Sequence, residues 1–332
     1  MRSHRSFLKD SYVRPVAILA GCLVILTLAD GGLGRVLSLA TTYTALESFS
    51  TFGLVALGLG MTMMIREFDL SVVGMFSLAG CIAVLTGGSS PVLGVICAMT
   101  VGVLAGAAQG LLMVRLRLGS IGITLGGLLI LAGVAYVLSE NRSIPYESIG
   151  VALEMNRRFA GVFSIRSLLT IAIFIVAGLV IATTRIGRDI IAIGSDRRAA
   201  IIGGVNVDGL IIAIFAFSGA TTALSGALLS YSLASAAPTG LTDVIVPAVA
   251  AAILGGVSLG GGTGRPMGIA LGALALGMLR AGFNALGTPP FVNDISMGII
   301  LMLVAITDGA RSWRRASQFR RWLAARDSTP ST

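Results

Sequence analysis

Few side chains in this sequence have the type and spacing needed for catalytic or metal chemistry. The only histidine, His4, lies in a basic segment before the first apolar run, and Cys22, Cys81 and Cys97 fall inside apolar runs with no paired spacing. We therefore predict neither a disulfide framework nor a metal site. No His, Cys or carboxylate cluster at catalytic spacing occurs within the apolar runs, so the sequence predicts no catalytic residue and no cofactor bound by this chain.

Acidic residues do stand between two apolar runs in residues 65–74, which read I-R-E-F-D-L-S-V-V-G. Ionisable groups near a membrane are unfavourable unless they are exposed, paired or used. The segment is thus either an exposed turn or a functional break. Asp69 and Ser71 also fit the N-cap and first turn of a helix that follows, and we favour this capping role on spacing alone.

A glycine-rich segment, residues 255–268, reads G-G-V-S-L-G-G-G-T-G-R-P-M-G. It follows an apolar run, lacks the G-x-x-x-x-G-K-[ST] pattern of a phosphate loop, and the chain has no lysine beyond Lys9. We therefore predict that the chain does not bind ATP through such a loop. Glycines at this position favour a tight reversal and close helix packing instead.

A polar stretch, residues 184–207, contains A-I-G-S-D-R-R-A-A-I-I-G-G-V. Its pattern predicts a short helix over residues 196–202, with Asp196 as the N-cap and with Gly203 and Gly204 at its end. Lying parallel to a membrane, such a helix would present its two arginines to a cytoplasmic partner.

The elements that position these segments are apolar. Apolar residues make up 55% of the 332 positions and charged residues 12%, about half the charged share of a soluble domain. The apolar runs are continuous, without period-2 alternation, so they predict helices rather than a β-barrel. The fold class is all-α and polytopic, with ten predicted spans at residues 13–30, 45–65, 70–87, 91–114, 121–139, 166–184, 210–231, 242–258, 267–284 and 291–308.

The net charge of +9 is better explained by membrane topology than by nucleic acid, because most basic residues flank the apolar runs on one side. With the N-terminus in the cytoplasm, alternate loops place most arginines there and leave only Arg35, Arg142, Arg157, Arg158, Arg166 and Arg280 at or near the outer side. We therefore predict a cytoplasmic segment 1–12, a transmembrane domain 13–308 and a basic cytoplasmic tail 309–332 suited to contact with anionic lipid.

The three segments, in this order, resemble the ribose-type permeases of carbohydrate ABC importers. The resemblance covers about residues 45–308, and the glycine turn is its most specific part. Residues that match the first and last motifs are Asp69, Leu70, Ser71, Gly74, Gly255, Gly256, Ser258, Leu259, Gly261, Gly262 and Gly264. By the same resemblance, Asp196, Arg197, Arg198, Ala199, Ala200 and Gly203 belong to a loop that couples the permease to its ATPase.

The resemblance implies a multi-pass protein of the bacterial inner membrane that works as a dimer, of identical or different permease chains. It implies two cytoplasmic ATP-binding subunits, which bind the ATP, and a periplasmic solute-binding protein. A monosaccharide or similar polyhydroxylated solute is expected to cross the membrane, and its identity is left open.

Some residues depart from the family pattern, among them Arg66 and Glu67 before the acidic position, Val73 before Gly74, Ser195-Asp196 in the loop, and Pro247. We expect Pro247 to kink the eighth span. A faint echo of the Asp69 motif at Asp243, at the start of the same span, fits either inverted repeats or chance.

Hydroxyl and amide side chains within the spans would suit passage of a neutral solute, although each could equally bond a neighbouring helix. The candidate pathway residues are Thr62, Gln109, Thr124, Ser218, Thr221, Thr222, Ser225 and Asn284. On the outer side, Arg142, Arg157 and Arg158 are candidates for steering a solute-binding protein.

Two other classes of membrane protein are alternatives to the permease. An ion-coupled secondary transporter would also have many spans, but it usually needs titratable groups at mid-membrane, and the acidic residues here lie near span ends. An integral-membrane enzyme lacks candidate catalytic residues.

Overall fold

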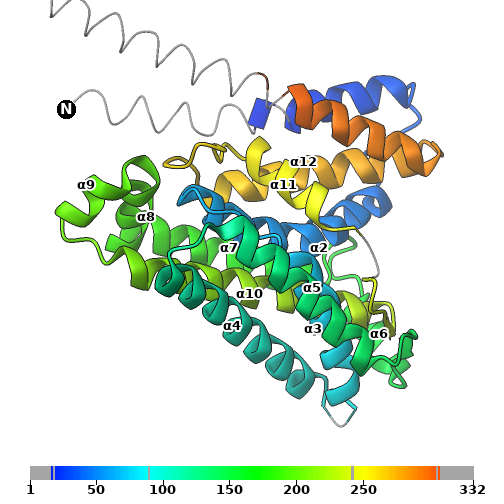
Figure 1. Cartoon of the computed structure of the whole chain (residues 1–332). Coiled ribbons are helices and arrows are strands. Elements are labelled where there is room, and N and C mark those ends of the chain that lie inside the picture. The colour runs from blue at the N-terminus through cyan, green and yellow to red at the C-terminus, as the bar shows by residue number, and fades with distance from the viewer. Residues whose placement is uncertain (1–15, 18, 89, 241–242, 304–305, 307–332) are drawn as a thin grey trace, which may run out of the picture.

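The computed structural model describes residues 16–17, 19–88, 90–240, 243–303 and 306 (Figure 1). Six helices in this part are long and apolar enough to cross a membrane: α2 (Leu39–Met64), α4 (Pro91–Leu116), α5 (Ser120–Leu138), α7 (Ile165–Thr183), α10 (Val207–Ser232) and α12 (Pro266–Ala285). Four shorter apolar helices are Leu19–Ala29, α3 (Val72–Thr86), α11 (Ile245–Leu254) and Pro290–Leu303. Each of the ten predicted spans overlaps one of these helices, which confirms the all-α polytopic fold.

The short helices correct the predicted lengths. α11 has 10 residues, about 15 Å at 1.5 Å per residue, so the prediction of a membrane-long helix over residues 242–258 is wrong. The predicted kink is wrong as well, because Pro247 lies in the first turn of α11, where its missing N–H has no intrahelical acceptor. A short helix is compatible with a membrane where protein surrounds it, and most of α11 is buried.

Helix α2 forms the centre of the bundle. Every residue from Phe49 to Met64 is buried, as expected for a helix that is apolar on all sides. Helices α7, α10, α11 and α12 contact it around its circumference (Figure 1). Helices α4, α5 and α7 expose many leucine, isoleucine and valine side chains, which suits contact with lipid.

Close backbone packing joins α4 to α10. Gly102 and Gly219 face each other, and a Cβ on either would lie 2.4 or 2.0 Å from the carbonyl oxygen of the other. Gly106 and Gly110, each one turn further along α4, meet the backbone of α10 in the same way. This small-residue seam lets two membrane helices approach closely.

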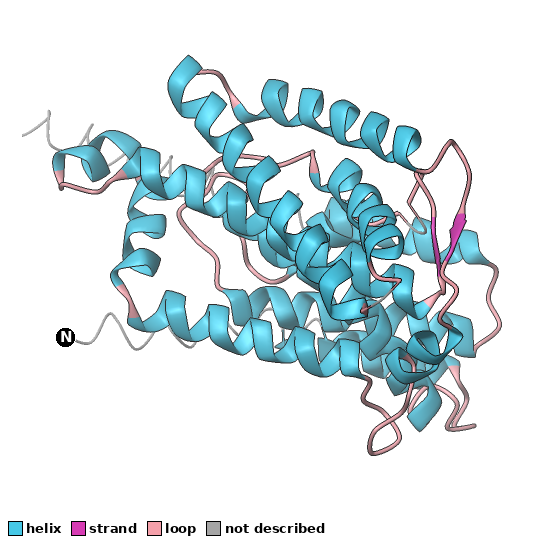
Figure 2. Cartoon of the chain, turned by 90° about the horizontal axis from the view of Figure 1, so that it is seen from below, coloured by secondary structure: helices cyan, strands magenta, loops and turns pink. Residues whose placement is uncertain are grey.

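Four additional elements lie in residues 140–165 and 185–209, the two longest intervals between the predicted spans. One loop contains a two-residue strand, β1 (Ile144–Pro145), and α6 (Ile149–Met155); β1 pairs antiparallel with β2 (Ser235–Ala236) (Figure 2). The other contains α8 (Arg185–Ser195) and α9 (Arg197–Ile202). Of these elements only α9 was predicted from the sequence, and the bounds of α9 agree with the predicted helix.

The predicted terminal segments 1–12 and 309–332 lie outside the described residues. The helices nearest to them, Leu19–Ala29 and Pro290–Leu303, pack against the end of α12, where Leu26 and Leu279 are buried and Ile300 is half-buried.

Candidate functional site

The three motif segments lie together at one end of the bundle, which we call the motif end and define by Arg66, Gly194 and Gly262. The N–H of Gly262 donates to the carbonyl of Met64 at 2.9 Å. The guanidinium of Arg66 donates from Nε to the carbonyl of Gly194 at 2.6 Å and from Nη2 to that of Ser195 at 2.8 Å. Segments separated by more than 60 residues are thus joined by backbone carbonyls.

Glycine is required at this junction for two different reasons. A Cβ on Gly194 would lie 1.9 Å from the carbonyl oxygen of Met64, closer than two such atoms can approach. Gly262 has φ +72°, in the left-handed region that other residues rarely adopt. The remaining predicted turn residues complete the same turn. The Ser258 hydroxyl accepts from the N–H of Gly260, and its carbonyl accepts from the N–H of Gly261. Gly256, Gly261 and Gly264 have positive φ, and Gly255 packs on the backbone of Gly268.

Asp69 is buried in the turn before α3, with 1% of its surface exposed. Its Oδ1 accepts from the N–H of Ser71 at 3.0 Å and from the Ser71 hydroxyl at 2.6 Å, while Oδ2 accepts from the hydroxyl of Ser218 on α10 at 2.8 Å. The predicted capping role is therefore confirmed in part: Asp69 holds the start of α3, and Ser71 occupies the N-cap position without a capping bond of its own. No local pattern in the sequence indicates the hydrogen bond from Ser218 of α10.

The rest of the first motif packs against α5. A Cβ on Gly74 would lie 2.5 Å from the carbonyl oxygen of Leu128, and Thr124 donates to the carbonyl of Phe68 at 3.1 Å. Leu70 is half-buried in the same turn. Thr124, one of the candidate pathway residues, thus stabilises the turn that contains the first motif.

Helix α9 projects from the motif end. The Asp196 carboxylate accepts from the N–H of Arg198 at 2.9 Å and from that of Ala199 at 3.0 Å, and hydrogen bonds from the Ala199 and Arg198 backbone hold the pKa of this carboxyl below its ordinary value. Ala200 is buried and Gly203 ends the helix. Arg197 pairs with Glu67 at 3.3 Å.

The outward face of α9 is apolar as well as basic. Ile201 is 57% exposed and Ile202 is 88% exposed, and Arg198 is exposed beside them. The two isoleucines at the tip of a short polar loop are the sequence signal for this apolar surface, whereas the predicted contact with a partner named only the neighbouring arginines.

The candidate pathway residues are mostly packed between helices. Ser225 donates to the carbonyl of Thr51, whereas Thr62 and Thr221 donate to carbonyls of their own helices. Thr222 and Gln109 are buried, and the Thr222 hydroxyl and the Gln109 carbonyl oxygen have no partner in the described part of the chain. Of the eight candidates, only Asn284 lines the polar cavity described next.

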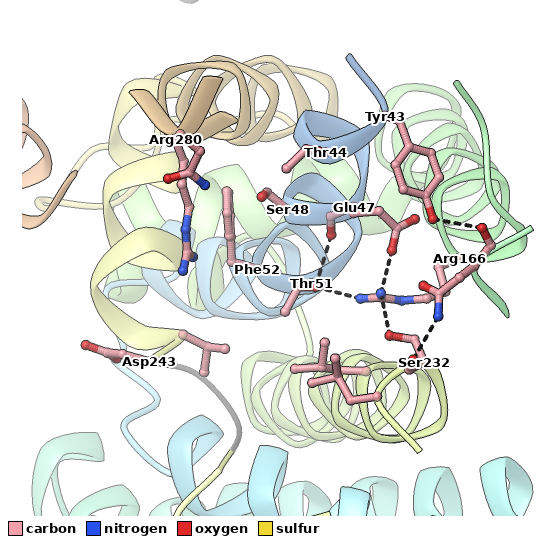
Figure 3. A pocket seen from close by; sticks show the side chains of 15 residues that line it. Tyr43, Thr44, Glu47, Ser48, Thr51, Phe52, Arg166, Ser232, Asp243 and Arg280 are labelled. Carbon is pink, nitrogen blue, oxygen red and sulfur yellow. Dashed lines mark hydrogen bonds and ion pairs between the residues drawn. The ribbon is translucent and has the colours of Figure 1, made fainter. Parts of the chain in front are cut away.

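A polar cavity of about 430 Å³ lies at the opposite end of the bundle, which we call the cavity end (Figure 3). The first turns of α2 and α7, the last turns of α10 and α12, and the start of α11 form its walls. The sequence does not predict this cavity, because its lining residues are far apart in the chain and none belongs to a recognisable motif.

A buried ion pair lies on one side of this cavity. Arg166 donates from Nη1 to Glu47 at 2.5 Å and to the Ser232 hydroxyl at 2.9 Å, and from Nη2 to the Thr51 hydroxyl at 2.7 Å. Ser164 donates to the second oxygen of Glu47. The Arg166 side chain is 4% exposed, and its Nε has no partner within the described chain.

The three arginines proposed for docking lie at the same end, exposed in the segments before and after α6. Arg142 pairs with Glu140 at 2.6 Å and Arg157 with Glu154 at 3.4 Å. The Arg158 guanidinium lies 4.4 Å from the centre of the Tyr43 ring. Two of the three therefore have acidic partners within the chain.

Within the described residues, no group of three or more His, Cys, Asp or Glu side chains could hold a metal ion. Cys22, Cys81 and Cys97 are free thiols.

Comparison with known proteins adds independent information. Residues 41–305 match the family model described as branched-chain amino acid transport system / permease component. The chain is 27% identical to the ribose import permease protein of Escherichia coli strain K12, over 93% of this chain and 98% of that protein. It is 30% identical to the ribose import permease protein of Bacillus subtilis strain 168, over 78% and 82% of the two chains. It is 31% identical to the L-arabinose transport system permease protein of Escherichia coli strain K12, over 79% and 80%. No solved structure gives a significant match.

Proposed function

Because the chain belongs to the family of branched-chain amino acid transport system permease components, we propose that it is the membrane-spanning subunit through which an ABC importer passes a monosaccharide. The solute class is supported by the ribose and arabinose permeases to which the chain is similar. A separate ATPase supplies the energy, and a solute-binding protein delivers the sugar. This role makes the chain a transport component rather than an enzyme.

The observation that carries the proposal is the motif end. Three separate sequence segments meet there through backbone carbonyls, and the helix they hold, α9, exposes Arg198, Ile201 and Ile202. An exposed apolar and basic helix tip on a rigid support is suited to insertion into a cleft of a partner protein. We assign that cleft to the ATPase, so the motif end would face the cytoplasm, in agreement with the predicted topology in which both termini are cytoplasmic.

Some residues of α9 stabilise the helix itself, whereas others are exposed and available to contact the ATPase. Asp196 caps the helix and Arg197 pairs with Glu67, so replacing either residue alters α9 itself. Arg198 and Ile202 are exposed and have no such role, so variants at these positions test contact with the ATPase directly.

The experiment is co-purification of the permease with the ATPase encoded beside it, for wild type, Ile202→Asp and Arg198→Ala, with Arg115→Ala as an exposed-arginine control on the last turn of α4. We expect Ile202→Asp to lose the ATPase, Arg198→Ala to weaken its recovery, and Arg115→Ala to behave as wild type. A folded wild-type permease that recruits no ATPase would contradict the importer assignment. Recovery unchanged in Ile202→Asp would contradict only the role of α9.

The solute is tested in the complete importer. Uptake of radiolabelled D-ribose, L-arabinose or D-fructose into proteoliposomes should require ATP and the binding protein. Uptake that continues without ATP hydrolysis and collapses with the proton gradient would instead support an ion-coupled secondary transporter.

At the cavity end we propose that Arg142, Arg157 and Arg158 steer the binding protein. Since Arg142 and Arg157 already pair with Glu140 and Glu154, we expect the single substitution Arg158→Ala to have the largest effect on docking. Such surface charges mainly increase the rate at which the binding protein associates with the permease, and this effect should weaken as the salt concentration is raised.

A further inference from the structure

The polar cavity contains a guanidinium without a partner. Arg280 lies on the last turns of α12, and it makes no hydrogen bond or ion pair with any other residue in the described part of the chain. A charged side chain within a membrane helix is unfavourable unless it faces water, an ion pair or a ligand. Arg280 faces the cavity (Figure 3), so the cavity is where its hydrogen-bonding capacity is directed.

A carboxylate lines the same side of the cavity. One oxygen of Asp243 accepts from the N–H of Ile245 at 3.3 Å at the start of α11. The other oxygen has no hydrogen bond among the described residues, and Asp243 forms no ion pair with Arg280 (Figure 3). The Arg280 guanidinium, with its hydrogen-bond donors, and an unpaired carboxylate oxygen of Asp243 therefore line one cavity without contacting each other.

The lining as a whole is charge-balanced. It holds two carboxylates, Glu47 and Asp243, and two guanidiniums, Arg166 and Arg280, of which Glu47 and Arg166 are already paired. A net-neutral lining with separate donor and acceptor groups suits a neutral solute with several hydroxyls better than an anion or a cation.

An apolar surface accompanies these groups. Phe52 lines the cavity between the two sets of charged residues, and Ser48 and Asn284 add a hydroxyl and an amide (Figure 3). Flat apolar surface with a few convergent polar groups, in a volume of a few hundred Å³, is the usual composition of a small-molecule site.

We propose that this cavity is a subsite of the permease for one neutral monosaccharide, in which Arg280 donates to one hydroxyl, Asp243 accepts from another, and the sugar ring rests against Phe52. The inference rests on the proposed function, since it places the transported solute inside the chain. It assigns the permease a share in selecting the sugar.

The test measures binding to the permease alone, reconstituted in lipid nanodiscs without the ATPase or the binding protein. Saturation-transfer NMR is recorded with D-ribose, L-arabinose, D-fructose and L-leucine, over increasing concentrations. The variants are Arg280→Gln and Asp243→Asn, each close in shape to the original residue, and the control is Arg115→Ala at the motif end. Each variant must keep the wild-type melting temperature.

We expect at least one sugar to saturate the wild type and the control alike. The half-saturating concentration should rise at least about tenfold in Arg280→Gln and in Asp243→Asn, the usual effect of losing a hydrogen bond to a charged group. Half-saturation unchanged in both variants, or signals from L-leucine alone, would overturn the assignment.

Parallel uptake assays with the complete importer keep the two proposals apart. If the wild-type importer takes up a sugar that gives no saturation transfer with the permease alone, the subsite is refuted and the proposed function stands. If the wild-type importer takes up none of the sugars, the proposed function fails, and the subsite fails with it.

Discussion

Breaking the buried ion pair at the cavity end should destabilise the protein strongly. The change we consider is Arg166→Met, which keeps much of the side-chain length and removes the guanidinium. Glu47 would then be left as a largely buried carboxylate, 15% exposed, with Ser164 as its remaining side-chain partner. The reciprocal change, Glu47→Leu, would leave the guanidinium buried without its counter-ion.

The magnitude follows from burial and hydrogen bonding. Removing one partner of a buried pair costs about 3–5 kcal/mol, because the other charge stays uncompensated. Arg166 also donates to Thr51 and Ser232, so we place Arg166→Met at the upper end of that range, about 5 kcal/mol. The double variant Glu47→Leu/Arg166→Met removes both charges, and its loss should be smaller than either single loss.

The assay is thermal unfolding of the detergent-solubilised chain, with all four members of the cycle measured under one condition. The exposed pair Arg142–Glu140 serves as the control, and Arg142→Ala should change stability by about 1 kcal/mol or less. Losses that simply add in the double variant would show that the two charges do not interact, which would refute the reasoning.

Three further predictions concern the motif end. Gly194→Ala should disrupt the junction with the Met64 carbonyl, 1.9 Å from the added Cβ, and limited proteolysis should then cut the α8–α9 region faster than in wild type; unchanged cleavage would contradict the contact. Ser218→Ala should cost about 2 kcal/mol by removing one of the hydrogen bonds to the buried Asp69 carboxylate, measured by thermal unfolding; a variant as stable as wild type would show that this bond is replaceable. The stabilisation of α9 by the Asp196 cap should depend on pH, because the carboxyl of Asp196 has a lowered pKa in the folded chain. The cap stabilises α9 fully at pH values above 3.8, the ordinary pKa of an aspartate. This stabilisation is lost as the pH falls through the lower pKa of the folded chain. Hydrogen exchange, corrected for its intrinsic rate, should therefore show protected α9 amides at pH 5 and loss of protection only below about pH 4; loss already at pH 5 would contradict the capping bonds.

The sequence predicted the fold well where the signal is local. Long apolar runs located all six long helices, and the Asp196 cap with the following glycines defined α9 correctly. These features depend on residues within a few positions of each other, so one sequence contains all the information needed.

Lengths and long-range contacts were harder to predict. α11 looked like a full span because apolar residues extend beyond Leu254, but the turn that follows ends the helix. α8 was missed because it carries charged residues on one face and is too short to stand out. The Arg166–Glu47 pair joins residues 119 positions apart, and no periodicity within either segment indicates such a contact.

The candidate site was predicted at one end only. The three motifs identified the motif end, whereas the cavity end is assembled from the end turns of four helices and the residues just before α11. Arg280 and Asp243 were placed near the outer side and the start of the eighth span, but a position along a span does not reveal which side chains face a common space.

Helix α2 has a mechanical consequence for the molecule. Its first turns, from Tyr43 to Phe52, line the cavity, and its last residue, Met64, holds Gly262 beside the α8–α9 junction. With 26 residues α2 is one uninterrupted helix, about 39 Å long. The two ends of the protein therefore have a stiff connection with no loop between them. A force applied at α9 passes to the end of α8, where Arg66 donates to the carbonyls of Gly194 and Ser195, and from there reaches the cavity wall along the axis of α2. The end of α8 can move independently of α2 only if these hydrogen bonds break.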